Sequence, residues 1–157
     1  MGMSPYVARI RAAISHDLLL SPSACAIIHN ERGEVLLMHR LDDDKWDPPG
    51  GHIDPDETPA QAVVREAYEE CGLTVKARRV VGVLGGRAYE HRYPNGDRTQ
   101  AHIVCFSCEV ISGTLKAIDG EAKGFGYFTR ETLPPLSTFY PDEILFNQIG
   151  DPVYFLP

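Results

Sequence analysis

The residues between positions 51 and 72 have types and spacings that could hold a divalent cation. Two glycines, Gly51 and Gly72, enclose an acidic run in the order G-x5-E-x7-R-E-x-x-E-E-x-G. Carboxylate oxygens are the ligands that Mg2+ prefers in proteins, and such ions orient and polarise phosphate groups during catalysis. The segment is therefore a candidate metal site for chemistry on phosphates.

The acidic run is expected to lie on a helix from about Pro59 to about Cys71. Thr58 can cap its first turn together with Gln61, and proline is favoured at the first helical position. Gly72 follows the last periodic residue and can take the left-handed conformation that ends a helix.

Three glutamates, Glu66, Glu69 and Glu70, stand at i, i+3 and i+4 on this helix. We expect them to cluster well away from its apolar stripe, where their mutual repulsion would become coordination once Mg2+ or Mn2+ binds. The alternative is an ordinary solvated acidic face, since glutamate is a good helix former. The apolar stripe comprises Ala60, Val63, Val64, Ala67 and Cys71.

The whole segment resembles the Nudix box, G-x5-E-x7-R-E-U-x-E-E-x-G-U, in which U is a bulky aliphatic residue. Every fixed position is present and Leu73 fits the final U, but Ala67 is smaller than the first U requires. Residues 46–51 look like the W-x-L-P-G-G run that usually precedes the box, with Pro48 in place of leucine. The resemblance implies an α+β protein, a Nudix-type α/β/α sandwich with a mixed β-sheet.

The resemblance also implies roles for the box residues. Glu66, Glu69 and Glu70 would bind Mg2+, for which Mn2+ can substitute, and the backbone carbonyl of Gly51 would add a ligand. Glu69 and Glu70 would thereby also be catalytic residues.

Other residues would support this centre. Glu57 and Arg65 would orient the metal-binding carboxylates, and Arg65 stands four residues before Glu69, within reach of an ion pair. Glu121 lies in an expected loop where many Nudix enzymes place a further metal ligand or a general base; the alternative is a solvated loop glutamate. The sequence leaves open whether Glu121 or a box glutamate accepts the proton of the attacking water.

The activity implied is a metal-dependent hydrolysis of a nucleoside diphosphate linked to another group, by attack of water on phosphorus. ADP-ribose or a nucleotide sugar is favoured, and a pyrophosphatase of canonical or oxidised (d)NTPs is the alternative. A non-catalytic nucleotide-binding sensor on the same fold is the competing class. Since such modules often lack a box glutamate, the intact box favours the enzyme.

Several side chains outside the box could contact the substrate. Aromatic rings can stack on a base and arginine can pair with a phosphate. For each, packing or surface charge is the simpler interpretation. The candidates are Arg40, Trp46, Tyr89 and Arg92, with His91 and Tyr93 beside them.

The composition fits one domain over residues 1–157, because 43% of the residues are hydrophobic in a chain of this length. No run of apolar residues is long enough to span a membrane, so no membrane partner is expected. The net charge of -7 disfavours a long nucleic acid and leaves a small nucleotide as the expected partner. A homodimer is one option for the oligomeric state.

Four cysteines, at positions 25, 71, 105 and 108, do not suggest a disulfide framework in a chain of this length. Cys105 and Cys108 form a C-x-x-C, which could bind zinc. They lie in an expected strand, however, where residues three apart point to opposite faces. We therefore expect buried thiols in a reducing compartment, which indicates the cytoplasm.

The remaining pattern predicts the elements that position the site. Asn-Gly at 95–96 is typical of a hairpin between the stretch near residue 90 and a strand over 98–111. The residues 30–33 suggest a second hairpin between the strands 23–29 and 34–40. The other expected elements are an N-terminal helical extension at about 4–16, a strand after the box helix, a strand over 125–128 and a helix over 141–149.

Overall fold

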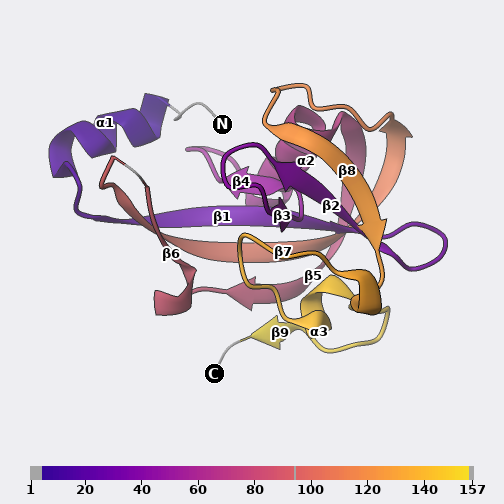
Figure 1. The fold of residues 1–157 in the computed structure, drawn as a ribbon. Coiled ribbons are helices and arrows are strands. Elements are labelled where there is room, and N and C mark those ends of the chain that lie inside the picture. The colour runs from indigo at the N-terminus through magenta and orange to yellow at the C-terminus, as the bar shows by residue number, and fades with distance from the viewer. Residues whose placement is uncertain (1–4, 94, 156–157) are drawn as a thin grey trace.

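The structure is a computed structural model that describes residues 5–93 and 95–155. Ser4, the first residue of the expected N-terminal extension, and Pro94, which precedes the expected Asn-Gly turn, lie outside the described residues. Figure 1 shows the arrangement of the elements. The helices are α1 (Pro5–Ile14), α2 (Pro59–Cys71) and α3 (Asp142–Leu145), with short 3-10 turns at Arg87–Tyr89 and Arg130–Thr132. The strands are β1 (Leu18–Ile28), β2 (Val35–Arg40), β3 (Trp46–Asp47), β4 (Gly50–His52), β5 (Leu73–Leu84), β6 (Glu90–Arg92), β7 (Arg98–Gly113), β8 (Ala122–Phe128) and β9 (Tyr154–Phe155).

The larger sheet has the strand order β4-β1-β7-β5-β9, with β6 paired to β7. Strands β1 and β7 run parallel, while β1–β4 and β5–β7 are antiparallel pairs. The smaller sheet has the order β3-β2-β8. The prediction of a mixed sheet in an α+β fold is therefore confirmed.

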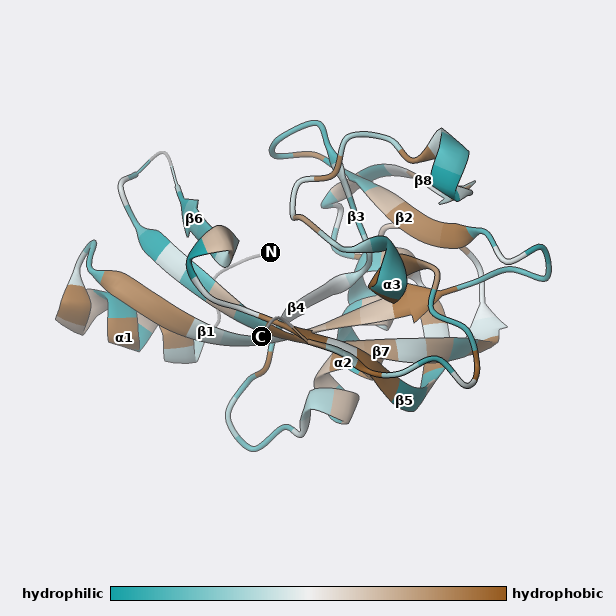
Figure 2. Ribbon diagram, turned by 90° about the horizontal axis from the view of Figure 1, so that it is seen from below, coloured by the Kyte–Doolittle hydropathy of each residue, from teal (hydrophilic) through white to brown (hydrophobic). Residues whose placement is uncertain are grey.

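Helices α2 and α3 pack on opposite faces of the larger sheet. Because side chains alternate along a strand, each strand can contribute residues to both faces. On β1, Cys25 and Ile27 belong to the core cluster that contains the residues of α3, whereas Ala26 and Ile28 pack in the cluster under α2. Figure 2 shows hydrophobic residues concentrated in the strands, with loops that are mostly hydrophilic. This layering confirms the predicted sandwich.

The cysteines are buried free thiols, as predicted. Cys105 and Cys108 lie in the two different core clusters, on opposite faces of β7. A zinc ion could not reach both sulfur atoms in this strand.

The helix α2 begins and ends where the sequence predicts. Thr58 and Gln61 form a reciprocal capping box at its start. Gly72 ends it in the left-handed conformation, with φ of 70°, and its N–H donates to the carbonyl of Tyr68. Local sequence signals thus fix the element that carries the box glutamates.

Replacing Gly72 with valine should lower the free energy of unfolding by about 1 kcal/mol or more, because a branched side chain resists positive φ. A Cβ there would also meet the carbonyl oxygen of Thr114 at 2.8 Å. Gly124→Val is the matched control, since a Cβ at Gly124 meets nothing within 4 Å. Urea denaturation checks this; equal stability of the two variants would contradict it.

Two element predictions need correction. The expected hairpin between residues 23–29 and 34–40 is reduced to a single bridge, between His29 and Val35. The strands then diverge into different sheets, because β2 is apolar on both faces and contributes Leu36 to one core cluster and Leu37 to the other.

The expected helix over 141–149 is only α3, Asp142–Leu145. The amide of Asn147 donates to the carbonyls of Glu143 and Pro152. This side chain supplies hydrogen bonds that a longer helix would have made with its backbone, and the chain turns away.

The N-terminal helix and the hairpin around residues 95–96 follow the sequence pattern. Helix α1 covers Pro5–Ile14, and β6 pairs with β7 in the predicted hairpin. Among the described residues, no helix has the length and apolarity needed to cross a membrane.

Candidate functional site

The glutamates of α2 are not all solvated. Glu70 is 2% exposed and Glu66 is 1% exposed, so their predicted position well away from the apolar stripe is wrong. The reason is helical geometry: Glu70 follows Val63 by seven residues, which returns it to within about 20° of the same direction. These two carboxylates therefore point into the body of the protein.

The buried position changes their proton affinity. Burial raises the pKa of Glu70 to about 8, although the backbone N–H of Gly50 donates to its Oε2 at 2.7 Å and opposes the shift. Burial also raises the pKa of Glu66 to about 7, against the attraction of Arg65. A nearby cation would return both groups to the ionised form.

Arg65 ties the box together. Its guanidinium donates to Glu57 at 2.7 and 2.9 Å, to Glu66 at 2.8 Å and to Glu69 at 3.0 Å. It also donates to the backbone carbonyl of His52 at 2.9 Å. The predicted ion pair with Glu69 is present, and the arrangement fits a role in orienting carboxylates.

The loop before β8 docks on the C-terminal end of α2. The backbone N–H groups of Ile118 and Asp119 both donate to the carbonyl of Glu69, and that of Lys116 donates to the carbonyl of Cys71. These carbonyls have no partner within their own helix, which makes them ready acceptors. The docking brings the acidic end of the loop over Glu70.

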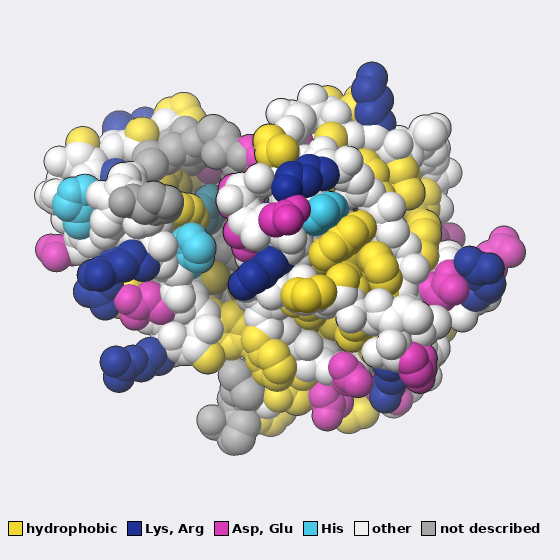
Figure 3. Space-filling model, in the orientation of Figure 1, with side chains coloured by type: hydrophobic (Ala, Val, Ile, Leu, Met, Phe, Trp, Pro, Cys, Tyr) yellow, Lys and Arg dark blue, Asp and Glu magenta, His cyan; other side chains and the backbone are white. Residues whose placement is uncertain are grey.

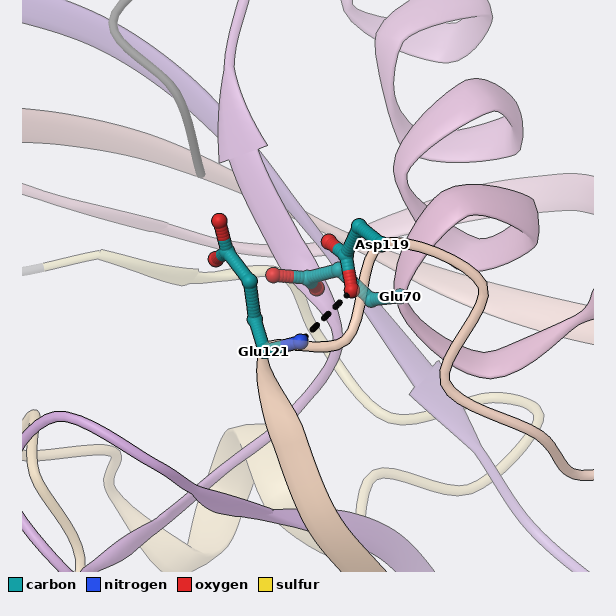
Figure 4. A group of neighbouring side chains, drawn as sticks. All are labelled: Glu70, Asp119 and Glu121. Atoms are coloured by element: carbon teal, nitrogen blue, oxygen red, sulfur yellow. Dashed lines mark hydrogen bonds between the residues drawn. The ribbon is translucent and has the colours of Figure 1, made fainter.

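The result is a cluster of three carboxylates, Glu70, Asp119 and Glu121, whose ligand atoms lie within 4.8 Å of one another. Figure 4 shows the side chains of the helix and the loop converging, with the N–H of Glu121 donating to Asp119 at 3.0 Å. Sequence reasoning missed Asp119. The available signal was that Asp119 is acidic and stands two positions before Glu121. The sequence did not reveal that this loop docks on α2.

Among the described residues, the structure does not bring Glu66 and Glu69 into this cluster, so the expected grouping of the three box glutamates is not found. Glu66 lies one turn before Glu70, and its Oε2 is buried with no hydrogen-bond partner. The carboxylate of Glu69 faces Arg65, and Gly51 pairs with Ala24 of β1 at the cavity wall.

A cavity of about 630 Å³ opens beside the acidic cluster, and Glu70, Glu121 and Gly51 lie in its wall. Among the predicted substrate contacts, Arg40 also lines it. The guanidinium of Arg40 pairs with Asp42 at 2.6 Å and lies 3.6 Å from Asp47. Its charge is thus balanced within the protein.

The remaining substrate candidates lie elsewhere. The ring of Trp46 stacks on that of His39, with 4.6 Å between the ring centroids, and packs against the core. Tyr89 is a core residue whose exposed fraction is 5%. Arg92 is exposed on β6 and does not line the cavity, whereas its neighbour Tyr93 does.

His52 is a further cavity residue that sequence reasoning did not select. Its Nδ1 shares a hydrogen bond with the hydroxyl of the buried Ser21, and burial lowers its pKa below the usual value. Its place directly after Gly51 was the available signal.

Comparison with known proteins agrees with this geometry. The family model for the NUDIX domain matches residues 19–147. A "MutT-like protein" from Streptomyces ambofaciens is 32% identical over 111 residues, which cover 71% of this chain and 65% of that protein. An "RNA pyrophosphohydrolase" from Yersinia enterocolitica is 43% identical over 60 residues, 38% of this chain and 34% of that protein. The chain thus spans less than two thirds of the length of these relatives.

Solved structures give the same family. An ADP-ribose pyrophosphatase from Streptococcus suis superposes with a TM-score of 0.67 at 27% identity, covering 86% of this chain and 98% of that one. A UDP-X diphosphatase shares the fold, with a TM-score of 0.65 at 18% identity over 97% of this chain and 74% of that one. The family match spans most of the chain and includes every residue of the box, and this chain therefore belongs to the Nudix family.

Proposed function

We propose that this protein is a metal-dependent pyrophosphohydrolase that cleaves a nucleoside diphosphate linked to another group, with ADP-ribose the favoured substrate. The observation that carries the proposal is the carboxylate cluster of Glu70, Asp119 and Glu121, of which Glu70 and Glu121 line a cavity of about 630 Å³. That volume lies within the usual range for small-molecule sites. The similarity to an ADP-ribose pyrophosphatase supports the choice of substrate.

The residues fit Mg2+ or Mn2+. Hard cations take oxygen ligands, and the cluster offers carboxylate oxygens within 4.8 Å of one another. The buried Oε2 of Glu66, which has no protein partner, is a further acceptor that a cation could satisfy. Glu66, Glu70, Asp119 and Glu121 would hold the metal, with Glu69 and the carbonyl of Gly51 as additional candidates.

A bound ion would neutralise phosphate oxygens and lower the pKa of the attacking water. The protein supplies the geometry. Arg65 holds the carboxylates of Glu57, Glu66 and Glu69 in fixed orientations. The N–H of Gly50 orients Glu70. One glutamate of the site, with Glu121 the first candidate, would accept the proton of the water.

Glu121 is the residue of the site to test first, as a metal ligand or as the base. Glu121→Gln should lower kcat about 10²-fold or more while the melting temperature stays within a few degrees, because a general base contributes at least that factor. Glu131→Gln, an exposed glutamate beyond the end of β8, is the control. Unchanged kcat in Glu121→Gln would move the base into the box.

A substrate panel with Mg2+ tests the function itself. ADP-ribose should yield AMP and ribose 5-phosphate, a triphosphate should yield a monophosphate and pyrophosphate, and 18O water would mark the attacked phosphorus. A 5'-triphosphorylated RNA belongs in the panel because of the similarity to an RNA pyrophosphohydrolase. Bound nucleotide without turnover of any member would favour a sensor module instead.

The cytoplasm remains the expected compartment, and a homodimer remains one option.

A further inference from the structure

The cavity extends well beyond the acidic cluster. Its wall continues to Val7 and Arg11 of α1 and to Tyr93 and Asn95 of the β6–β7 hairpin. Figure 3 shows the molecule hollowed between the lobe that holds α1 and β6 and the lobe that holds β2 and β8. The two ends of the cavity therefore belong to different parts of the fold.

Arg11 fixes α1 against the hairpin. This side chain is 9% exposed and donates to the carbonyl of Arg98 at 2.6 Å, to the hydroxyl of Thr99 at 2.9 Å and to the carbonyl of Asp17 at 2.7 Å. It also lies 3.7 Å from the carboxylate of Asp97. Because protein groups already engage its donors and balance its charge, Arg11 holds the helix in place and is not a free phosphate ligand.

The helix is an addition to the domain that the family model matches, since the match starts at residue 19. The strand β1 joins the two ends of the cavity: Ser23 lies beside the β4 residues near Glu70, and Leu19 lies beside Thr99 of β7. Leu19 stands four positions before Ser23 along the strand, a distance of about 13 Å. The far end thus stands off from the acidic cluster by more than a diphosphate needs.

The far end has the chemistry of a site for a flat heterocycle. Val7, Leu19 and the ring of Tyr93 offer apolar and aromatic surface, and Tyr93 is 41% exposed. Asn95 and Thr99 line the same end, where the side-chain amide of Asn95 pairs with Asp97 and the hydroxyl of Thr99 accepts from Arg11. The charged residues at this end, Arg11 and Asp97, are paired with each other. An apolar and aromatic surface of this kind suits a nucleobase, which stacks on rings, better than it suits a phosphate.

We propose that α1 and the β6–β7 hairpin form the subsite for the nucleobase of the substrate, with Val7 and Leu19 on one side and Tyr93 on the other. The N-terminal helix is then a specificity element acting within its own chain. This inference rests on the proposed function, because it takes the acidic cluster as the place where the diphosphate binds.

The test compares two tryptophan variants on one helix. Val7→Trp would fill the subsite, whereas Ala8→Trp changes an exposed neighbour on α1. Calorimetry with AMP, which carries the base, and ribose 5-phosphate, which lacks it, measures Kd. Val7→Trp should raise the Kd of AMP about 10-fold or more, equivalent to about 1.4 kcal/mol. It should leave the Kd of ribose 5-phosphate unchanged, and Ala8→Trp should change neither.

Tyr93→Ala tests the opposite wall and should raise the Kd of AMP while leaving that of ribose 5-phosphate unchanged. This second variant keeps the test decisive if Val7→Trp does not fold. In turnover, both variants should raise KM for ADP-ribose and change kcat little, since they remove binding shared by ground state and transition state. Equal AMP affinity in all variants, or equal loss for both probes, would overturn the proposal. Selective loss of AMP in a protein without turnover would instead retain the subsite and refute the hydrolase.

Discussion

Replacing Glu70 with glutamine should lower kcat about 10³-fold or more, equivalent to about 4 kcal/mol of activation free energy. Glutamine keeps the shape of the side chain and an oxygen that can accept from the N–H of Gly50. It removes the negative charge that the site would offer to a cation. Steady-state kinetics with saturating Mg2+ measures the loss.

The fold should survive this change, because burial already disfavours the ionised form of Glu70 and raises its pKa to about 8. The melting temperature without metal should be equal to that of the parent or higher. Glu143→Gln, an exposed residue of α3, is the matched control and should change neither quantity. Near-normal turnover of Glu70→Gln would show that the metal assignment is wrong.

Replacing Arg65 with alanine should lower the free energy of unfolding by about 3 kcal/mol at pH 8, because it leaves buried charge without its partner. Glu66 is the residue most affected: its carboxylate is 1% exposed and Arg65 is its ion-pair partner. Urea denaturation at pH 8 and at pH 6 measures the loss.

The pH dependence has a definite sign. Burial raises the pKa of Glu66 to about 7 even with Arg65 present, and removal of Arg65 would raise it further. When the pKa of a carboxyl is higher in the folded state than in the unfolded state, the free energy of unfolding of the protein falls as pH rises. The deficit should therefore be larger at pH 8 than at pH 6, and Arg65→Ala combined with Glu66→Gln should recover part of it. Equal deficits at both pH values would contradict this account.

The sequence predicted the parts of the site that local rules govern. Helix α2 depends on a capping box at Thr58, proline at its first position and glycine at its end, and all three are short-range signals. The box pattern likewise placed Arg65 within reach of Glu69. Because these features depend on residues a few positions apart, one sequence was sufficient to predict them.

Other parts of the site depend on contacts that spacing does not encode. Asp119 reaches Glu70 because its loop docks on the end of α2, and Tyr93 reaches the cavity because β7 pairs with β1. The burial of Glu70 could have been predicted from its spacing of seven residues from Val63, whereas that of Glu66 depends on how far the neighbouring sheet extends around the helix. Trp46 and Tyr89 were selected by residue type, which does not distinguish a core aromatic from one in the cavity.

The docked loop has a consequence for motion. Glu69 accepts from the N–H groups of both Ile118 and Asp119, and among the described residues a further backbone hydrogen bond joins this loop to α2, from Lys116 to Cys71. Local opening at that point would carry Asp119 and Glu121 away from Glu70 while the sheet stayed intact, since small units of a protein open below the global unfolding free energy. Amide hydrogen exchange at Ile118 and Asp119 would then be faster than in the core strands, and a cation bridging loop and helix would slow it. Exchange at these two amides would thus report how often the site disassembles.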